Sequence, residues 1–286
     1  MNVPQAPPDV TSLRRRGSAL AHNTLRNFEQ WIAFIAPPPR LRILRPPLPV
    51  IAGAAAMLYL VVGVMFRFDA AGTAWARNLA QGVRDVFEEI TNFGLSGWFL
   101  FPFGFILLGL AAIITSSLSR MSRGVLTALA ARFGFLFLAI GVPGLFATVV
   151  KRLIGRARPF VGGHDDPFAY MPFIWRPEYA AMPSGHSTTS VAAAIAIGAI
   201  WPRTRWVMWL YALTIMLSRV VVLAHHPSDV IAGALVGAAG VYLVRRWFVA
   251  RRLVFCPRDL RAYPGPSLRR IWAALRQGIA GAGASL

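Results

Sequence analysis

The chain contains a single lysine, Lys151, among its 30 basic residues, and the others are all arginines. Arg158 and Pro159 follow this lysine after six intervening residues. A lysine ammonium is a compact point charge, whereas an arginine guanidinium is a planar fork that grips one anion with two hydrogen bonds. Two helical turns separate Lys151 from Arg158, so a continuing helix would present both on one face before Pro159 turns the chain. This pair predicts a phosphate site.

A second polar segment, Pro183-Ser184-Gly185-His186, precedes an apolar stretch. Serine is a favoured helix N-cap, and glycine lets the backbone approach a ligand closely. Backbone N–H groups at the start of a helix bind phosphate well. Taken alone, the tetrapeptide also fits an ordinary loop.

A third polar segment contains Ser218, Arg219, His225 and Asp229. Arg219 lies six residues before His225, which predicts an arginine about 9 Å below the outer end of a membrane helix. Such a cation usually faces the interior of a bundle and has a partner. His225 and Asp229 are four residues apart, so their side chains could meet across one helical turn. A carboxylate in that position fixes the tautomer of a histidine.

The composition is that of a membrane protein, because 56% of the residues are hydrophobic and only 14% are charged. A helix needs ~20 apolar residues to cross a bilayer. Six candidate spans are predicted at residues 46–66, 97–117, 125–150, 187–201, 204–224 and 230–248. The third span contains Arg132, and the last three have short uncharged parts.

The formal net charge of +19 would suit nucleic-acid binding, but its distribution argues against a nucleic-acid partner. Arginines cluster in residues 1–45 and after the sixth span, which six spans would place on one side of the membrane. The positive-inside tendency makes that side cytoplasmic. The loop after the third span would face outside, yet it carries Lys151, Arg152, Arg156, Arg158 and Arg176. An anionic ligand explains positive charge in that place.

Three regions are predicted: a basic N-terminal segment at 1–45, a six-span domain at 46–248 and a basic tail at 249–286. The first region fits either a disordered tail or an interfacial amphipathic helix that would end at the prolines of 37–39. Residues 68–93 predict a second amphipathic helix, on the outer interface, containing both Trp75 and Ile90. Residues 164–166 suit either a cation site or, preferably, an exposed polar loop. His226 is expected at the interface or in contact with the lipid headgroup. Cys256 has no intramolecular disulfide partner.

Together the three segments resemble the complete signature of the type 2 phosphatidic acid phosphatase (PAP2) superfamily, which includes membrane lipid phosphatases and vanadium haloperoxidases. The resemblance rests on Lys151-x6-Arg158-Pro159, Pro183-Ser184-Gly185-His186 and Ser218-Arg219-x5-His225-x3-Asp229. No position departs from the pattern. The likeness covers residues 151–229, and the predicted spans extend it to 46–248. It is specific for the superfamily but not for a substrate.

The resemblance implies a role for each motif residue. His225 would attack phosphorus to form a phosphohistidine, and Asp229 would orient it. His186 would protonate the leaving oxygen and then help to activate water. The phosphoryl oxygens would be held by Lys151, Arg158, Ser184, Gly185 and Arg219. Phosphoryl transfer requires positioning and charge stabilisation, and these cations would supply the charge without a metal ion or other cofactor.

We therefore expect an all-α bundle of six transmembrane helices with interfacial amphipathic helices. It would hydrolyse the phosphate monoester or pyrophosphate of a lipid at the periplasmic face of a bacterial inner membrane, with both termini cytoplasmic. Candidate substrates are undecaprenyl pyrophosphate, phosphatidic acid, phosphatidylglycerophosphate and lipid A. Membrane lipids would surround the protein, and the sequence does not indicate its oligomeric state.

Two other functions fit the same residues. A lipid phosphotransferase would pass the phosphoryl group from the same phosphohistidine to an alcohol, and release of inorganic phosphate without an acceptor would distinguish a hydrolase from it. A non-catalytic lipid-binding or transport protein would bind without turnover, and the intact histidines count against this class. The predicted spans argue against a soluble haloperoxidase.

Overall fold

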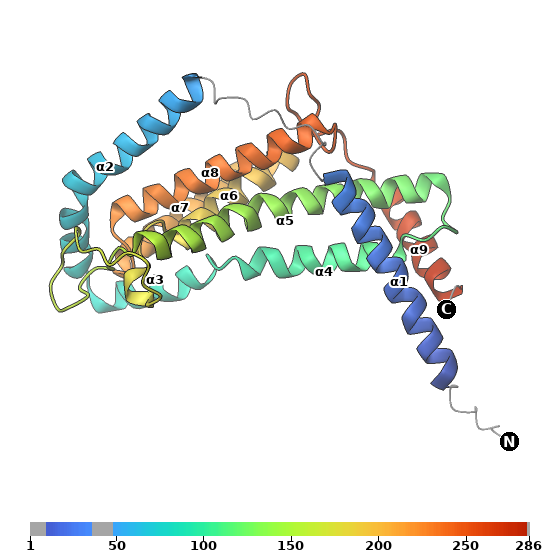
Figure 1. The fold of residues 1–286 in the computed structure, drawn as a ribbon, viewed down its shortest axis with the longest axis horizontal. Coiled ribbons are helices and arrows are strands. Elements are labelled where there is room, and N and C mark those ends of the chain that lie inside the picture. Colours follow the sequence, from blue (N-terminus) through green and yellow to red (C-terminus); the bar gives the residue numbers. More distant parts are fainter. Residues whose placement is uncertain (1–9, 36–47, 285–286) are drawn as a thin grey trace. The chain divides into compact units, whose positions relative to one another are not determined.

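The structure, a computed structural model, describes residues 10–35 and 48–284, and in these residues the regular elements are all helices, joined by loops that contain two isolated β-bridges. The α-helices in Figure 1 are α1 (Val10–Ile35), α2 (Leu48–Arg77), α3 (Gln81–Asn92), α4 (Gly97–Ile113), α5 (Arg120–Ile154), α6 (Gly185–Ile200), α7 (Arg205–Val221), α8 (Pro227–Ala250) and α9 (Leu268–Ala284). Two short 3-10 helices span Pro177–Tyr179 and Pro202–Thr204. The predicted all-α class is confirmed.

Among the described residues, four helical segments are long and apolar enough to cross a membrane. They are Ile51–Arg77, Gln81–Ile113, Arg120–Ile154 and Pro227–Ala250. Helices α6 and α7 have 16 and 17 residues and fall short of that length. The predicted count of six spans is therefore not matched, although a helix occupies each predicted position. Residues 46 and 47 of the first predicted span, and the prolines of 37–39, lie outside the described residues.

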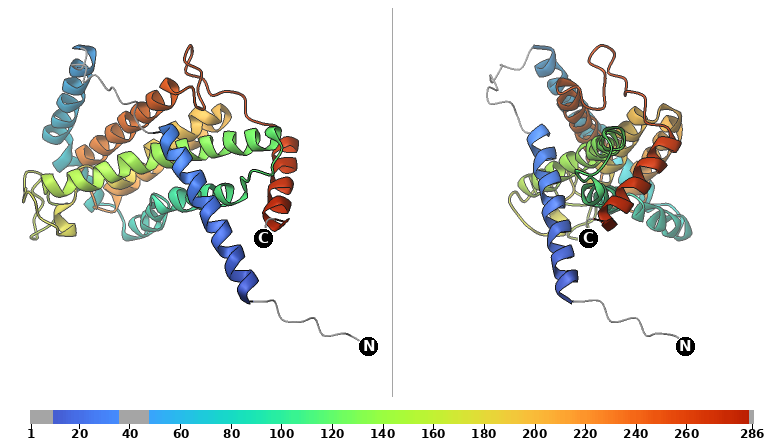
Figure 2. Two further views of the ribbon diagram at one scale, coloured as in Figure 1. Left: turned by 45° about the vertical axis from the view of Figure 1, so that its right-hand side comes forward. Right: turned by 90° about the vertical axis from the view of Figure 1, so that its right-hand side faces the viewer.

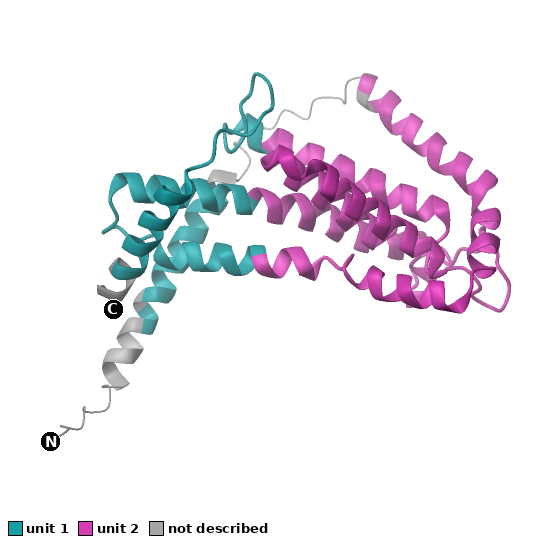
Figure 3. Ribbon diagram, turned by 180° about the vertical axis from the view of Figure 1, so that it is seen from behind, with its two compact units in different colours: residues 1–40, 103–134, 248–286 teal, residues 41–102, 135–247 magenta. Residues whose placement is uncertain are grey.

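The chain divides into two compact units, which Figure 3 shows in different colours. Unit 1 comprises residues 1–40, 103–134 and 248–286, and unit 2 comprises residues 41–102 and 135–247. Helices α4 and α5 each contribute to both units. The predicted region boundaries at 46 and 248 differ from this division and stay a prediction.

Within unit 1, side-chain amides of α1 satisfy the open carbonyls at the end of α4. Asn27 is buried and donates to the carbonyls of Ala111 and Ile114, at 2.8 and 2.7 Å. Asn23 donates to the same two carbonyls and to that of Ala112. The last carbonyls of a helix have no partner inside it, so these amides fix the crossing of α1 over α4.

Unit 2 has a core of small side chains. Figures 1 and 2 show α6, α7 and α8 side by side with the C-terminal half of α5. Val191, Ala194 and Ala212 form a buried cluster between α6 and α7. A Cβ at Gly237 of α8 would lie 2.5 Å from the Thr188 carbonyl oxygen of α6. Small residues let membrane helices approach closely, and here they allow polar side chains of several helices to meet.

Helix α2 is longer than the sequence predicted, because it continues past residue 66 to Arg77. Trp75 therefore lies in α2, and only Gln81–Asn92 forms the separate amphipathic helix α3. The additional turns of α2 carry Asp69 and Thr73, which are both buried. This extension brings a carboxylate of the first membrane helix into unit 2.

Candidate active site

Lys151 lies in the last turn of α5, and Arg158 lies beyond its end. Gly155 stops the helix with a φ of 63°, and its N–H donates to the Lys151 carbonyl at 3.0 Å. A Cβ at Gly155 would collide with the Met171 carbonyl, so this turn needs a glycine. The prediction that Lys151 and Arg158 share one helical face is wrong, because backbone pairing with Met171 replaces the helix.

Beyond Gly155 the chain runs through the loop of residues 155–184, called the outer loop here because the sequence predicts it on the outer side, and backbone hydrogen bonds hold it in place. The Arg158 N–H donates to the Glu178 carbonyl at 2.8 Å. The Ala181 N–H donates to the Arg156 carbonyl at 3.1 Å. These bonds fix the backbone of both arginines. Burial lowers the pKa of Arg158, although the nearby Glu178 carboxylate acts in the opposite direction. The Arg158 Nε has no hydrogen-bond partner among the described residues.

The start of α6 brings the second motif against the first. Ser184 is the N-cap, as predicted, and its side chain accepts from the Ser187 N–H at 3.5 Å. The Ser184 N–H donates to the Asp229 carbonyl at 3.0 Å, which ties this turn to α8. A Cβ at Gly185 would lie 3.1 Å from the Lys151 Nζ. The lysine ammonium therefore lies directly over the start of α6.

His186 and Arg219 lie against the α3 segment. A Cβ at Gly94 would lie 2.8 Å from the His186 Cδ2, so any larger residue at position 94 would clash with the imidazole ring. The buried Arg219 donates to the Thr91 Oγ1 at 2.6 Å, and its Nε has no partner in the described structure. Helix α7 ends at Val221, so Arg219 is in its last turn rather than about 9 Å below the end as predicted.

His225 lies in the turn between α7 and α8 and is buried. Its backbone N–H donates to the Arg219 carbonyl at 3.1 Å. Its Nδ1 is 3.7 Å from the Asp229 Oδ2, so the two side chains meet as predicted, although α8 begins after His225. Burial lowers the pKa of His225 to about 4, despite the neighbouring carboxylate. His225 is therefore neutral at neutral pH, the state in which a ring nitrogen can act as a nucleophile.

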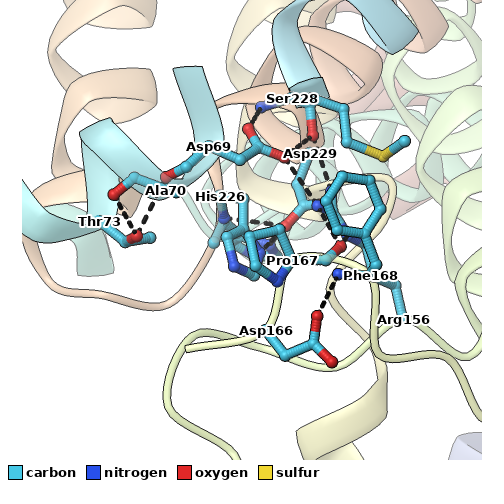
Figure 4. Close-up of polar contacts among 12 residues, drawn as sticks. Asp69, Ala70, Thr73, Arg156, Asp166, Pro167, Phe168, His226, Ser228 and Asp229 are labelled. Atoms are coloured by element: carbon cyan, nitrogen blue, oxygen red, sulfur yellow. Dashed lines mark hydrogen bonds and ion pairs between the residues drawn. The ribbon is translucent and has the colours of Figure 1, made fainter. Parts of the chain in front are cut away.

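A fully buried arginine, Arg156, holds Asp229 in place, as Figure 4 shows. Its NH1 donates to the Asp229 Oδ1 at 2.5 Å and to the Ser228 Oγ at 2.7 Å. Its NH2 donates to the Asp69 Oδ2 at 2.7 Å and to the Pro167 carbonyl at 2.8 Å. Its Nε donates to the same carbonyl at 3.0 Å. All five N–H donors of the guanidinium are thus used.

Asp69 of α2 completes this buried network. It accepts from the Ser228 N–H at 2.8 Å and from the Ser228 Oγ at 2.6 Å, in addition to Arg156. Asp69, Arg156 and Asp229 are each fully buried, so the two carboxylates depend on this arginine for compensation. The network thereby joins α2, the outer loop and the first turn of α8.

His226 has a different environment from the one predicted. It is fully buried, its Nε2 lies 3.0 Å from the Asp165 Oδ1, and its backbone N–H donates to the Asp229 Oδ2 at 2.9 Å. Asp165 also accepts from the Thr73 hydroxyl of α2. Burial lowers the pKa of His226, but the hydrogen bond and charge of Asp229, with a bond to Asp165, outweigh it and raise that pKa. The interfacial position predicted for His226 is wrong, and Asp165 belongs to this contact.

A cavity of about 370 Å³ opens beside His186 in unit 2. Its walls come from residues 94–100, from the middle of α5 and from the first turns of α6. Gly141 and Gly144 of α5 leave room along one wall, and Leu100 and Leu145 make the lining largely apolar. The cavity therefore joins a polar end at His186 to an apolar space between helices.

The family model of the PAP2 superfamily matches residues 132–253, a range that contains all three motif segments. The lipid A 1-phosphatase of Rhizobium johnstonii is 35% identical over 195 residues, which cover 68% of this chain and 78% of the relative. The chain belongs to the PAP2 superfamily. A second relative of this PAP2 protein, the lipid A 1-phosphatase of Rhizobium etli, is 36% identical over 175 residues, which cover 60% of this chain and 74% of that one.

A solved structure also resembles the PAP2 protein: the PAP2-type phosphatidylglycerolphosphate phosphatase of Bacillus subtilis. The two share 19% identity with a TM-score of 0.44, over 69% of this chain and 94% of that one. The predicted superfamily and the prediction of an integral-membrane phosphatase are confirmed by the family model and the relatives.

Three contacts of the site were not predicted: the buried carboxylate of Asp69, the salt bridge between Arg156 and Asp229, and the hydrogen bond between Thr91 and Arg219. Asp69 had a usable signal, because a carboxylate following a long apolar run is costly and needs a partner. Arg156 was noted only as one of several outer-loop charges. Among the described residues, no group of three or more His, Cys, Asp or Glu side chains is arranged to hold a metal ion.

Proposed function

We propose that this PAP2 protein removes a phosphate group from lipid A through a phosphohistidine formed at His225. The observation that carries the proposal is the placement of the buried His225 beside Asp229, at the point where motif residues of α5, α6 and α7 come together. The choice of lipid A among the four candidate lipids is supported by the two lipid A 1-phosphatases.

In the first step, the Nε2 lone pair of His225 attacks phosphorus, and the Asp229 carboxylate, whose Oδ2 lies 3.7 Å from Nδ1, stabilises the positive charge that develops on the ring. The bond from phosphorus to the lipid oxygen breaks, and that oxygen takes a proton from His186. Burial and the charges of Arg219, Lys151 and Arg158 disfavour the protonated form of His186, and the negative charge of a bound phosphate would offset them. In the second step His186 accepts a proton from water, whose oxygen attacks the phosphohistidine and releases inorganic phosphate.

The cationic side chains Lys151, Arg158 and Arg219 would hold the phosphoryl oxygens, together with the backbone of Ser184 and Gly185. Free donor capacity supports this role, because the Nε atoms of Arg158 and Arg219 have no partner in the described structure. Donors of this kind that are already in position stabilise the charge of a phosphoryl transition state. A resident metal ion is not required by this scheme.

The apolar cavity beside His186 supports a lipid as the phosphate donor. The phosphate would lie at the polar end of the cavity, and apolar parts of the lipid would extend between α4 and α5. We place this site at the periplasmic face with both termini cytoplasmic, as the arginine distribution favours. Cysteines at positions 164 and 280 in a Cys256→Ser background test this orientation: a membrane-impermeant thiol reagent on intact cells should label only position 164.

Release of inorganic phosphate from a panel of lipid phosphates tests the proposed reaction. The purified protein would receive lipid A, phosphatidic acid, phosphatidylglycerophosphate or undecaprenyl pyrophosphate in detergent, without an alcohol acceptor. We expect the highest kcat/KM with lipid A. A higher kcat/KM with another lipid would overturn the lipid A assignment alone. Tight binding of all four lipids with no phosphate released would refute hydrolysis and favour the transferase or binding functions.

A further inference from the structure

Unit 1 contains a cavity of about 580 Å³ that shares no residue with the candidate active site. The N-terminal turns of α5 form one wall, and the segment 252–264 forms the other. Four arginines line it: Arg120, Arg123, Arg132 and Arg252. No acidic side chain is among the lining residues. The cavity is therefore strongly cationic.

No carboxylate among the described residues neutralises these charges. Arg132 is buried, and its bonds go to the carbonyls of Ala128, Tyr263 and Pro264, at 2.9 to 3.1 Å. Carbonyls satisfy its donors but carry no charge, and a buried cation without an anion is costly. None of the ion pairs within the described residues includes any of the four arginines. The cavity therefore lacks the anion that its charges would favour.

Within the described residues of unit 1, no carboxylate is placed to supply this anion. Of the 11 acidic residues of the chain, only Asp9, Glu29 and Asp259 fall in the ranges of this unit. Asp259 pairs with Arg261 at 3.8 Å, and neither Glu29 nor Asp259 lines the cavity. Neither described carboxylate of unit 1 therefore neutralises the cavity, and an external anion would fill this role.

The walls indicate what kind of anion fits. Between the arginines lie apolar surfaces such as Ala131, Leu253 and Val254. The cavity lies at the N-terminal end of α5, a candidate membrane span, where the bilayer surface is expected. Guanidinium forks bind phosphate oxygens, and basic pockets at the ends of membrane helices bind acidic headgroups. We propose that this cavity binds the anionic phosphate headgroup of a membrane phospholipid as a site separate from the catalytic one.

Arginines at the end of a span also serve to orient a protein in the membrane. Orienting the protein requires only the charges of these arginines, whereas binding a lipid headgroup also requires an open cavity. A substitution that fills the cavity and keeps the charges therefore distinguishes the two roles. Gly124 lines the cavity, and a Cβ there would meet nothing within 4 Å. Gly124→Leu would fill the space without changing a charge, and leucine favours the helix. Gly134→Leu is a matched control, because Gly134 is equally open and does not line the cavity.

The test is a titration of the purified protein in neutral detergent with phosphatidylglycerol, a phosphodiester, and separately with phosphatidylcholine. We expect saturable binding of phosphatidylglycerol at least tenfold tighter than that of phosphatidylcholine. Gly124→Leu and the double variant Arg120→Gln/Arg123→Gln should each weaken it by roughly tenfold or more. Gly134→Leu and Arg269→Gln/Arg270→Gln, which changes two exposed arginines of α9, should bind like the wild type.

Phosphatase turnover and an unchanged size-exclusion profile show that each variant is folded. Wild-type affinity in Gly124→Leu, or an equal loss in the two control variants, would overturn the site and leave only a general effect of charge. Displacement of phosphatidylglycerol by an equal concentration of inorganic phosphate would show that the cavity takes a free anion, and would overturn the lipid assignment.

Discussion

Replacing Arg156 by lysine should damage the enzyme even though the charge is kept. The guanidinium of Arg156 makes five hydrogen bonds to four partners, which come from α2, the outer loop and α8. A lysine ammonium has three N–H donors on one nitrogen and cannot span these partners. At least two hydrogen bonds made by a charged donor are therefore lost.

The size of the effect follows from the number of lost bonds. A hydrogen bond to a charged group contributes about 1.5 to 3 kcal/mol, so two lost bonds cost about 3 to 6 kcal/mol. That is a large share of the ~5 to 15 kcal/mol by which proteins are usually stable. The carboxylates of Asp69 and Asp229 are fully buried and cannot turn to water instead. Asp229 would then no longer hold His225 in a fixed position.

Thermal unfolding and steady-state kinetics of Arg156→Lys measure both consequences. We expect a clearly lower Tm and a kcat reduced roughly tenfold or more, about 1.4 kcal/mol of activation free energy, with a smaller change in KM. Arg152→Lys is the matched control, because Arg152 lies four residues earlier and its NH1 has no hydrogen-bond partner in the described structure. It should remain within about twofold of the wild type. Wild-type Tm and kcat in Arg156→Lys would refute the role given to the network.

Three further outcomes are expected. The carboxylates of Asp229 and Asp165 raise the pKa of His226 in the folded protein. The protonated ring therefore stabilises the fold fully below the ordinary histidine pKa of about 6.5, and this stabilisation is lost as the pH rises through the raised pKa. The Tm difference between wild type and His226→Gln should therefore shrink from acidic to alkaline pH, and a constant difference would contradict the charged contact. Lys151→Arg should lower kcat roughly tenfold. The ammonium lies so close to the start of α6 that even a Cβ at Gly185 would be only 3.1 Å from it, and a guanidinium is wider. An unchanged kcat would show that the shape of this cation is unimportant. Turnover should persist in EDTA while vanadate inhibits it, and activity lost to EDTA and restored by Mg²⁺ would overturn the metal-free scheme.

The sequence predicted the parts of the site that depend on local spacing. Ser184 at the start of an apolar stretch predicted an N-cap, and the four-residue spacing of His225 and Asp229 predicted their contact. It could not predict the end of α5, because Gly155 stops that helix only in combination with backbone bonds to residues 169–171. Nor could it pair Arg156 with Asp69, 87 residues away, since that contact requires the packing of α2.

The number of membrane spans likewise depends on contacts between distant residues that the local sequence pattern does not show. Hydropathy located all the central helices, but α6 and α7 are shorter than a full span. Their interiors are packed through small residues such as Ala194 and Ala212, so burial against neighbouring helices takes the place of apolar length. Packing of that kind depends on residues far away in the chain, and no periodicity within either helix reveals it.

Trapping of the phosphoenzyme tests the central claim most directly. The purified protein would be mixed with lipid A labelled in its phosphate, quenched in alkali within the first turnover, and digested to locate the label. We predict an acid-labile, base-stable phosphate on His225, which His225→Ala and His225→Gln abolish together with phosphate release while both variants remain folded. A label on any other residue, or near-normal turnover in His225→Ala, would contradict the assignment of His225 as the nucleophile.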